Sequence, residues 1–478
     1  MLRQTKIVAT LGPASSDPII LRAMLTAGVD VVRINFSHTD ADASALLLIT
    51  LVRQIAEELK QPLAVMADLQ GPKIRIGRFK DKAITLVDGQ NFTLNCLDSE
   101  QLGDVHEVFV AYPNLAYELT PGDHLLINDG LIELKVKSLS DSKIHCIVIE
   151  GGILSDLKGL NRKGGGLAAR TLTDKDIQDL RTAISAEVDY ISMSFVKDAS
   201  DIRHARALMN EFGAKKTPII AKIERSEALE HLTEIIEEAD AIMVARGDLG
   251  VEVGAAEVPA IQKNIIKQAR RLDKLVITAT QMMESMITNP QPTRAEVSDV
   301  ANAILDGTDA VMLSAETASG QFPVKVLSMV NKICLSAEKH ASFYYQSTSE
   351  VWHCRRADQA IAIATMHAAN LFPIQAIITL TESGDTALWI SRQQGTVPII
   401  AVSANKRTLG RLSLARNVFP VFMNYHHFAA DTLNQQVLSE LITSQHIENK
   451  GFVLLTRGRI IGIQGGTNSM EIINVTPL

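Results

Sequence analysis

Eight short runs of apolar, often β-branched residues recur along the chain, and longer stretches with another pattern lie between most of them. In residues 201–212 and 258–272, for example, apolar residues recur every three or four positions, which is typical of a helix with one buried face. Alternating strands and helices predict a parallel sheet, and eight repeats predict that it closes into a (β/α)8 TIM barrel. An open, doubly wound sheet is the structural alternative. The eight expected strands are residues 6–11, 31–37, 63–68, 190–195, 219–224, 241–245, 275–280 and 310–314.

The third and fourth runs are separated by a segment that is too long for a loop and has its own pattern. Short strand-like runs alternate there with turn signals such as 88–90 and 128–130, so we expect an inserted small β-barrel domain. The segment opens at Gly71-Pro72 and closes with three glycines at 164–166. Glycines at both junctions suit a lid hinged over the barrel mouth, although such glycines also serve in surface turns.

A third region begins at about residue 345. A helical pattern at 358–371 is followed by five strand-like runs, which predicts a separate, open α/β domain. The expected domains are a discontinuous catalytic barrel of residues 1–70 and 167–343, an inserted β-rich lid of residues 71–166, and a C-terminal α/β domain of residues 344–478.

Polar residues gather at the ends of the expected barrel strands, where barrel enzymes carry their active sites. Side chains two positions apart on a strand share a face, so Lys222 lies beside Glu224, and Thr278 beside Thr280. Taken singly, such groups are solvated strand ends or, for Lys222 and Glu224, a structural ion pair. A structural core would not place polar groups at the same end of seven consecutive strands. The set is Arg33, Asn35, Ser37, Asp68, Ser194, Lys222, Glu224, Arg246, Gly247, Asp248, Thr278, Thr280, Ser314 and Glu316.

The residue types in this set indicate phosphoryl transfer. Glu224 and Asp248 are hard oxygen ligands that suit Mg²⁺ or Mn²⁺ rather than zinc. Arg33 and Lys222 supply positive charge for a phosphoryl group or an enolate, and Gly247 lets backbone amides approach a ligand closely. No histidine or cysteine lies among the strand ends, which argues against nucleophilic catalysis by either. Phosphoryl transfer needs positioning and charge neutralisation, and these residues supply both.

No Walker A sequence occurs, so a nucleotide would have to lie between the barrel and the lid. The candidates to contact it are His38, Arg75, Lys158 and Lys175, although each one alone is explained equally as a solvated surface charge.

Composition narrows the setting of the protein. The 478 residues carry a net charge of −7 with no basic arm, which argues against nucleic-acid binding. The four cysteines lack disulfide or metal-ligand spacing. The N-terminus does not match a signal peptide, and no apolar run reaches the roughly 20 residues that a membrane span requires. We therefore expect a cytoplasmic protein without a membrane partner.

Several long, contiguous segments resemble the pyruvate kinases, over essentially the whole chain. They are KIVATLGPAS at 6–15, VRINFSH at 32–38, DLQGPKIR at 68–75, AKIE at 221–224, MVARGDLG at 243–250, TATQMMESM at 278–286, PTRAE at 292–296 and MLSAET at 312–317. The resemblance implies transfer of the phosphoryl group of phosphoenolpyruvate to ADP, giving pyruvate and ATP as the final step of glycolysis. It also implies a requirement for Mg²⁺ or Mn²⁺ and an enolpyruvate that is then protonated.

The resemblance assigns roles to matching positions. Lys222 would stabilise the phosphoryl group in flight, and Arg33 would contact it. Glu224 and Asp248 would hold the metal ion. Thr280 would bind substrate and take part in protonating the enolpyruvate. The amides of Gly247 and Asp248 would hold the substrate carboxylate. The residues that would face the nucleotide are Arg33, His38, Arg75, Lys158 and Lys175.

One departure from the family pattern concerns potassium. Many family members bind K⁺ at positions that match Asn35, Ser37 and Asp68, together with a threonine. That threonine position is Leu69 here, and Lys73 stands where those relatives have a glutamate. A Lys73 ammonium can supply internally the charge that K⁺ supplies elsewhere. We therefore expect an enzyme of the bacterial, K⁺-independent kind.

A second departure concerns regulation, which the resemblance places in the C-terminal domain. The loop at 381–386 matches one that cradles an effector phosphate, but Asp385 stands where relatives carry an arginine and would repel a phosphate. The expected effector is a sugar monophosphate or AMP, or none. The expected contacts are Thr381, Glu382, Ser383, Gly384 and Thr386.

The family also forms homotetramers, to which helix 360–369 could contribute an interface, although core packing explains its apolar residues equally well.

Two rival functions remain at this point. An aldolase or lyase acting on pyruvate would use a barrel lysine as a Schiff base. Against it, Lys222 is two residues from a carboxylate, and charge pairing keeps a lysine protonated. A non-catalytic ligand sensor would be expected to have lost Lys222, the carboxylates or Thr280, and all of them are present.

Overall fold

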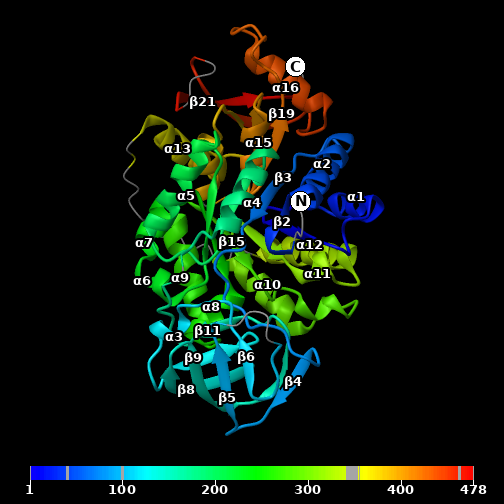
Figure 1. Ribbon diagram of the computed structural model, residues 1–478. Helices are drawn as coiled ribbons and strands as arrows, with labels where there is room; N and C mark the ends of the chain where they lie inside the picture. The colour runs from blue at the N-terminus through cyan, green and yellow to red at the C-terminus, as the bar shows by residue number, and fades with distance from the viewer. Residues whose placement is uncertain are drawn as a thin grey trace.

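The computed structural model describes residues 2–38, 42–97, 102–168, 170–340, 354, 356–393, 395–460 and 465–476. Its centre is a closed barrel of parallel strands in the order β1-β16-β15-β14-β13-β12-β3-β2, with helices around it (Figure 1). Each strand lies within a run predicted from the sequence, so the TIM barrel is confirmed and the open-sheet alternative is wrong. The strands are β1 (Lys6–Leu11), β2 (Val31–Asn35), β3 (Ala64–Asp68), β12 (Tyr190–Met193), β13 (Ile219–Ile223), β14 (Ala241–Ala245), β15 (Leu275–Ala279) and β16 (Ala310–Leu313).

The helices of this part begin and end where local chemistry directs. Thr173 and Thr293 cap α4 and α10, and in each case the side chain at the third helical position, Asp176 or Glu296, returns the hydrogen bond. Gly307 ends α10 with a φ of +94°, which favours glycine. The helices are α1 (Pro18–Thr26), α2 (Asp42–Glu58), α4 (Asp174–Ser185), α5 (Ala199–Glu211), α6 (Ser226–Glu230), α7 (Leu232–Glu238), α8 (Arg246–Val253), α9 (Val258–Arg271), α10 (Arg294–Asp306), α11 (Ala315–Ala318) and α12 (Pro323–His340), with 3-10 turns η1 (Phe36–His38) and η2 (Glu284–Ile287).

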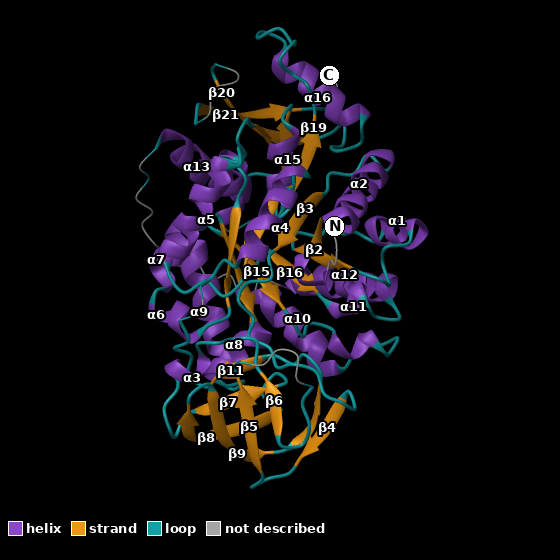
Figure 2. Cartoon of the chain, viewed as in Figure 1, coloured by secondary structure: helices purple, strands orange, loops and turns teal. Residues whose placement is uncertain are grey.

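The segment between β3 and β12 folds around an apolar core of its own. Its strands form one sheet in the order β11-β7-β8-β9-β5-β6 and a second sheet of β10 and β4, so the predicted small barrel is divided into two sheets. In Figure 2 this insert lies at one end of the barrel, and the C-terminal domain lies at the other. Its elements are β4 (Ala83–Leu86), β5 (Asn91–Asn95), β6 (Glu107–Phe109), α3 (Leu115–Glu118), β7 (His124–Ile127), β8 (Ile132–Ser140), β9 (Lys143–Glu150), β10 (Gly152–Ser155) and β11 (Leu160–Arg162).

The C-terminal domain is an open α/β sheet in the order β19-β18-β17-β20-β21, in which only the pairing of β21 is antiparallel. Its elements are α13 (Ala357–Leu371), β17 (Ile374–Leu380), α14 (Asp385–Arg392), β18 (Ile399–Ser403), α15 (Lys406–Leu412), β19 (Val418–Phe422), α16 (Leu433–Thr443), β20 (Phe452–Gly458) and β21 (Thr467–Asn474). The boundaries drawn between the three domains stay predictions. In the part of the chain that the structure describes, no helix is long and apolar enough to cross a membrane.

The two ends of the barrel face different partners. The chain passes from the C-terminal end of β3 into the insert, so the strand ends that carry the predicted site face that insert. At the opposite end, the Tyr190 hydroxyl donates a hydrogen bond to the Arg411 carbonyl, and Lys6 Nζ donates to the Val418 carbonyl at 2.6 Å. The C-terminal domain therefore packs on the N-terminal ends of the barrel strands.

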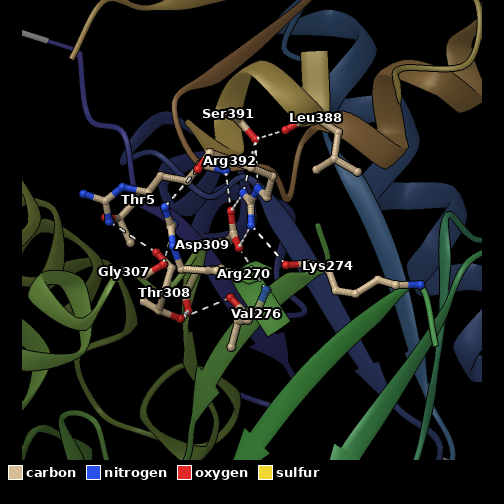
Figure 3. Close-up of polar contacts among 12 residues, drawn as sticks. Thr5, Arg270, Lys274, Val276, Gly307, Thr308, Asp309, Leu388, Ser391 and Arg392 are labelled. Carbon is tan, nitrogen blue, oxygen red and sulfur yellow. Dashed lines mark hydrogen bonds and ion pairs between the residues drawn. The ribbon is translucent and has the colours of Figure 1, made fainter. Parts of the chain in front are cut away.

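A buried polar cluster joins that domain to the barrel (Figure 3). Arg392, at the end of α14, pairs with Asp309, just before β16, and both side chains are fully buried. Asp309 Oδ2 accepts from Arg392 Nη1 at 2.8 Å and from the Val276 amide at 2.9 Å, and Oδ1 accepts from the Arg416 amide at 3.1 Å. Burial would raise the pKa of Asp309, but the Arg392 guanidinium outweighs it and holds the pKa below its usual value.

Candidate active site

Lys222, on β13, lies at the centre of the polar groups at the barrel mouth. Its Nζ lies 2.8 Å from Glu224 Oε1 and 3.6 Å from Asp68 Oδ1, and it donates to Ser194 Oγ at 2.7 Å. Burial would lower the pKa of Lys222, but the two carboxylates outweigh it, so the pKa is raised. Lys222 is therefore a fixed cation and not a neutral nucleophile.

Asp68, at the end of β3, joins two cations. Its Oδ2 accepts from Arg33 Nε at 2.6 Å, while Arg33 Nη1 donates to Thr10 Oγ1 at 2.9 Å. Burial would raise the pKa of Asp68, but the charges of Lys222 and Arg33 together hold it below its usual value. Asp68 Oδ1 has no hydrogen-bond partner among the described residues. A buried carboxylate oxygen of this kind is a place for a water molecule or a cation.

Glu224 and Asp248 are a second pair of carboxylates at the barrel mouth, at the ends of β13 and β14. Glu224 accepts from the Phe195 amide at 2.7 Å, and Asp248 lies in the first turn of α8. Burial raises the pKa of Glu224; Lys222 opposes the rise and the negative charge of Asp248 adds to it. A divalent cation relieves this repulsion, so the pair fits Mg²⁺ or Mn²⁺. Within the described ranges no three His, Cys, Asp or Glu side chains form a metal cluster, so water and substrate oxygens would complete the coordination.

Lys73, which follows β3, reaches this carboxylate pair. Its Nζ lies 2.8 Å from Asp248 Oδ1. The contacts of the described residues include none between the Lys73 ammonium and Asn35, Ser37 or Asp68, the predicted potassium-site residues. The structure therefore places this positive charge at Asp248, away from the predicted potassium-site residues.

The rest of the predicted potassium site lies along the ends of β2 and β3. Asn35 Oδ1 accepts from the Ser37 amide at 3.1 Å. The Leu69 side chain is buried in the barrel core, and its carbonyl accepts from Ser194 Oγ at 2.7 Å. Leu69 thus offers a cation no side-chain oxygen, in contrast to the threonine expected at that position.

Thr280 follows β15 in an uncommon backbone conformation. Its φ is +65°, and that of Gln281 is +53°. For a β-branched residue such a conformation costs about 1–3 kcal/mol. Thr280 Oγ1 accepts from the Gly247 amide at 2.8 Å and donates to the Ala279 carbonyl at 2.6 Å. The hydroxyl is therefore held beside the amides that begin α8.

Two other strand-end groups have structural partners. The prediction that Thr278 shares a strand face with Thr280 is wrong, because β15 ends before Thr280 and the turn redirects the chain. Thr278 is fully buried and donates to Thr308 Oγ1 at 3.0 Å. Glu316 accepts from the Ser314 amide at 2.7 Å and the Met283 amide at 3.1 Å, which ties α11 to the loop after β15.

Two of the predicted nucleotide contacts lie on different parts of the chain, one on the barrel and one on the insert. Lys175, on α4, donates to the Phe36 carbonyl at 2.9 Å and pairs with Asp179 at 2.6 Å. Arg75, on the insert, donates to the Leu157 carbonyl at 2.9 Å. Both cations are thus held by their own domain.

Lys158, Arg33 and His38 complete the predicted nucleotide set. Lys158 is half-buried on the insert, and its carbonyl accepts from the Ile76 amide at 3.0 Å. Arg33 lies with Asp68. The side chain of His38 lies outside the described residues. The set is therefore spread over barrel and insert, and its nucleotide role stays a prediction.

The loop between β17 and α14 is closed by its own hydrogen bonds. The Gly384 amide donates to Thr381 Oγ1 at 2.9 Å, and Gly384 has a φ of +89°. The Asp385 carboxylate accepts from Ser383 Oγ at 3.0 Å and from Arg411 Nη1 at 2.9 Å. The Asp385 carboxylate is therefore already paired with Arg411, the arginine that contacts this turn.

The remaining residues of the loop are also engaged. Glu382 Oε1 accepts from the Tyr425 hydroxyl at 3.0 Å and lies 3.4 Å from His426 Nε2. Thr386 Oγ1 shares a hydrogen bond with Thr467 Oγ1 at 2.8 Å. The five predicted effector contacts thus lie on this loop and in the first turn of α14, and their hydrogen-bond partners lie inside the domain.

Sequence reasoning missed two contributions. The Phe195 amide, which anchors Glu224, comes from a residue with a φ of +58°, and a backbone conformation leaves no signal in residue type. Thr10 holds Arg33 from the first strand, and the apolar pattern of that strand gives Thr10 no role. Its place in KIVATLGPAS was the signal that could have found it.

Comparison with known proteins matches two segments of the chain to one family. Residues 2–327 match the model described as "Pyruvate kinase, barrel domain", and residues 359–473 match "Pyruvate kinase, alpha/beta domain". The chain belongs to the pyruvate kinase family. A "Pyruvate kinase" of Buchnera aphidicola subsp. Baizongia pistaciae is 47% identical over 477 residues, covering 99% of each chain. "Pyruvate kinase II" of Salmonella typhimurium is 44% identical over 482 residues, again covering 99% of each.

A "Pyruvate kinase" of Haemophilus influenzae is 42% identical over 474 residues, covering 98% of this chain and 97% of its own. Membership of the pyruvate kinase family makes the chain a phosphotransferase, and the family generally needs Mg²⁺ and usually K⁺.

Proposed function

We propose that this chain transfers the phosphoryl group of phosphoenolpyruvate to ADP, giving pyruvate and ATP in the final step of glycolysis. The observation that carries the proposal is Lys222, a buried and permanently charged lysine beside Glu224 and Asp68. A cation fixed in a water-poor site stabilises a phosphoryl group in flight without having to reorganise. Family membership supports the reaction, and this geometry supports the role of Lys222.

In the proposed site, two cationic side chains contact the transferred phosphoryl group and two carboxylates bind the metal ion. Arg33, oriented by Asp68, contacts the phosphoryl oxygens, and Lys222 stabilises the charge that develops on them. Glu224 and Asp248 would hold Mg²⁺ or Mn²⁺, which when bound would supply charge neutralisation for the substrate. The Lys73 ammonium balances Asp248 from the insert side.

Substrate binding and protonation involve the turn beside α8. The amides of Gly247 and Asp248 hold the substrate carboxylate at the start of this helix. Thr280 places its hydroxyl at the Gly247 amide and takes part in protonating the enolpyruvate.

The nucleotide lies between barrel and insert, facing Arg33, His38, Arg75, Lys158 and Lys175.

Replacement of Lys222 tests the proposal. Lys222→Met should lower kcat in a lactate-dehydrogenase-coupled assay by about 10²–10³-fold, because one preorganised charge is lost. Mn²⁺ binding, followed by the signal of free Mn²⁺ in electron paramagnetic resonance, should change little because Glu224 and Asp248 remain. Lys263→Met, which removes an exposed lysine on α9, is the matched control and should keep normal turnover. Near-normal turnover of Lys222→Met would show that the assignment is wrong.

A Schiff-base lyase remains distinguishable in the same preparation. Because the pKa of Lys222 is raised, borohydride with pyruvate should leave Lys222 unlabelled. Covalent labelling of Lys222 would support the lyase instead.

Assembly and location complete the proposal. We expect a homotetramer in the cytoplasm, and light scattering of the purified protein measures the mass that decides the first point.

A further inference from the structure

Arg246 holds the strained turn after β15, although the proposed reaction gives it no role. Its side chain is 9% exposed and lies against the backbone of this turn. Arg246 Nη2 donates to the Thr280 carbonyl at 2.7 Å, and Nε donates to the Ala279 carbonyl at 3.2 Å. A longer contact of 3.4 Å reaches the Gln281 carbonyl. One guanidinium therefore spans the carbonyls on both sides of the two left-handed residues.

The guanidinium is itself fixed from the next helix. Arg246 Nη1 lies 2.7 Å from Asp299 Oδ2 and donates to Asp299 Oδ1 at 2.8 Å. Asp299 belongs to α10, which is capped by Thr293 and packs against α12 and β16. A planar guanidinium with several partners has one orientation, which a lysine ammonium cannot reproduce.

The same segment also holds Thr280 from its other side. Gly247, the residue after Arg246, donates its amide to Thr280 Oγ1 at 2.8 Å. The start of α8 thus grips the backbone of the turn with a side chain and the hydroxyl with an amide. Loss of the Arg246 side chain would release the Ala279 and Thr280 carbonyls and leave the Gly247 amide as the contact of α8 with the Thr280 hydroxyl.

We propose that Arg246, oriented by Asp299, is a positioning residue for the Thr280 hydroxyl in the protonation of enolpyruvate. This inference rests on the proposed function. In that step a proton adds to C3, the electron pair of the C2–C3 double bond forms the new C–H bond, and the enolate oxygen becomes the carbonyl. No oxidant or reductant is needed. The reverse step exchanges the methyl protons of pyruvate with solvent.

The test compares proton exchange with phosphoryl transfer in Arg246→Met. Exchange is followed as loss of the pyruvate methyl signal by NMR in D₂O with Mg²⁺ and ATP, and transfer by the coupled assay. A misplacement of about 1 Å costs about 100-fold in rate, so methyl exchange should fall by about that factor. The KM for ADP should stay within twofold, because Arg246 lies at the Thr280 turn and not among the predicted nucleotide contacts.

Two further variants separate positioning from folding. Arg246→Lys keeps the positive charge but not the planar set of guanidinium donors, so the rate of methyl exchange should be only partly restored relative to Arg246→Met. Asp299→Asn keeps the volume and leaves the arginine in place, and should lower exchange by about tenfold, within the range for a lost orienting partner. Arg206→Met is the matched control, because it also removes an arginine that pairs with an aspartate, Asp240, at 2.7 Å. Asp240 precedes β14, whereas Arg246 follows it, so this pair lies at the opposite end of the strand.

The outcomes separate the two levels of the proposal. A wild-type chain without kinase activity contradicts the proposed function itself. With an active wild type, methyl exchange within twofold of normal in folded Arg246→Met and Asp299→Asn overturns the inference. An equal loss in Arg206→Met, or a loss that appears as a raised KM for ADP, also overturns it, since either result indicates general destabilisation.

Discussion

Lys222 and Asp68 show how two buried residues set each other's charge. Each group would favour its neutral form if it were buried alone, and together with Arg33 and Glu224 each stays ionised. The outcome depends on partners from three strands, and it could not be read from the residue types alone. The sequence placed Lys222 beside Glu224 through their spacing, but it gave no sign that Asp68 would lie within 3.6 Å of Lys222.

At the same scale, Lys73 decides the expected response to potassium. The ammonium lies at the mouth on Asp248, so a positive charge is present there without a bound monovalent ion. Activity in sodium-only or tetramethylammonium buffer should equal that with added KCl. Lys73→Met should lose activity in that buffer and regain part of it with KCl, because K⁺ can then supply the positive charge that is missing beside Asp248. A many-fold stimulation of the wild type by KCl would contradict the prediction.

At the scale of elements, the pattern of apolar runs in the sequence predicts the barrel, and it predicts the ends of the strands to within a residue or two. Buried strands in a parallel barrel are apolar on both faces, so their runs are continuous and easily found. The side-chain directions beyond those ends did not follow. Thr280 and Phe195 both leave their strands with positive φ, and the alternation of side chains stops at such a residue. The order in which the strands of the insert pair could not be predicted either, because short strands with turns on both sides do not specify their partners.

The loop between β17 and α14 is the element on which regulation is predicted. Asp385 lies on Arg411 and Ser383, so an entering phosphate would meet a carboxylate in place of a free arginine. Titration of ribose 5-phosphate, AMP or fructose 1,6-bisphosphate should shift the phosphoenolpyruvate saturation curve little, with any response confined to the monophosphates. Asp385→Ser should free Arg411 and increase the response to ribose 5-phosphate. If none of the three ligands shifts the curve of either protein, the regulatory role of this loop is wrong.

At the scale of the whole molecule, the barrel lies between the insert and the C-terminal domain. The insert faces the strand ends that carry the site, and the C-terminal domain packs on the other ends (Figure 2). The loop of the effector prediction begins α14, and the last residue of that helix is Arg392, which binds Asp309 next to β16. Helix α14 therefore runs from the predicted effector loop to the base of the barrel. The order of the domains could be predicted from the sequence. The contact between Asp309 and Arg392 could not, because the two residues are far apart in the chain.

The Asp309–Arg392 pair should control how firmly the C-terminal domain is attached. Asp309→Asn leaves Arg392 as an uncompensated buried charge, and breaking a buried pair in this way costs about 3–5 kcal/mol in the free energy of unfolding. Glu187→Gln is the matched control, because it removes an exposed ion pair with Arg407 between the same two parts, which should contribute little.

Acid should act on the same joint in a defined direction. The folded-state pKa of Asp309 lies below its unfolded value of about 3.9, so its contribution is fully present above that value and is lost as the pH falls through the folded pKa. Thermal unfolding from pH 7 down to pH 3 should therefore show a loss of stability at the acid end that is smaller in Asp309→Asn. Equal acid sensitivity of the two proteins, together with equal costs for Asp309→Asn and Glu187→Gln at pH 7, would show that the buried pair does not hold the domains together.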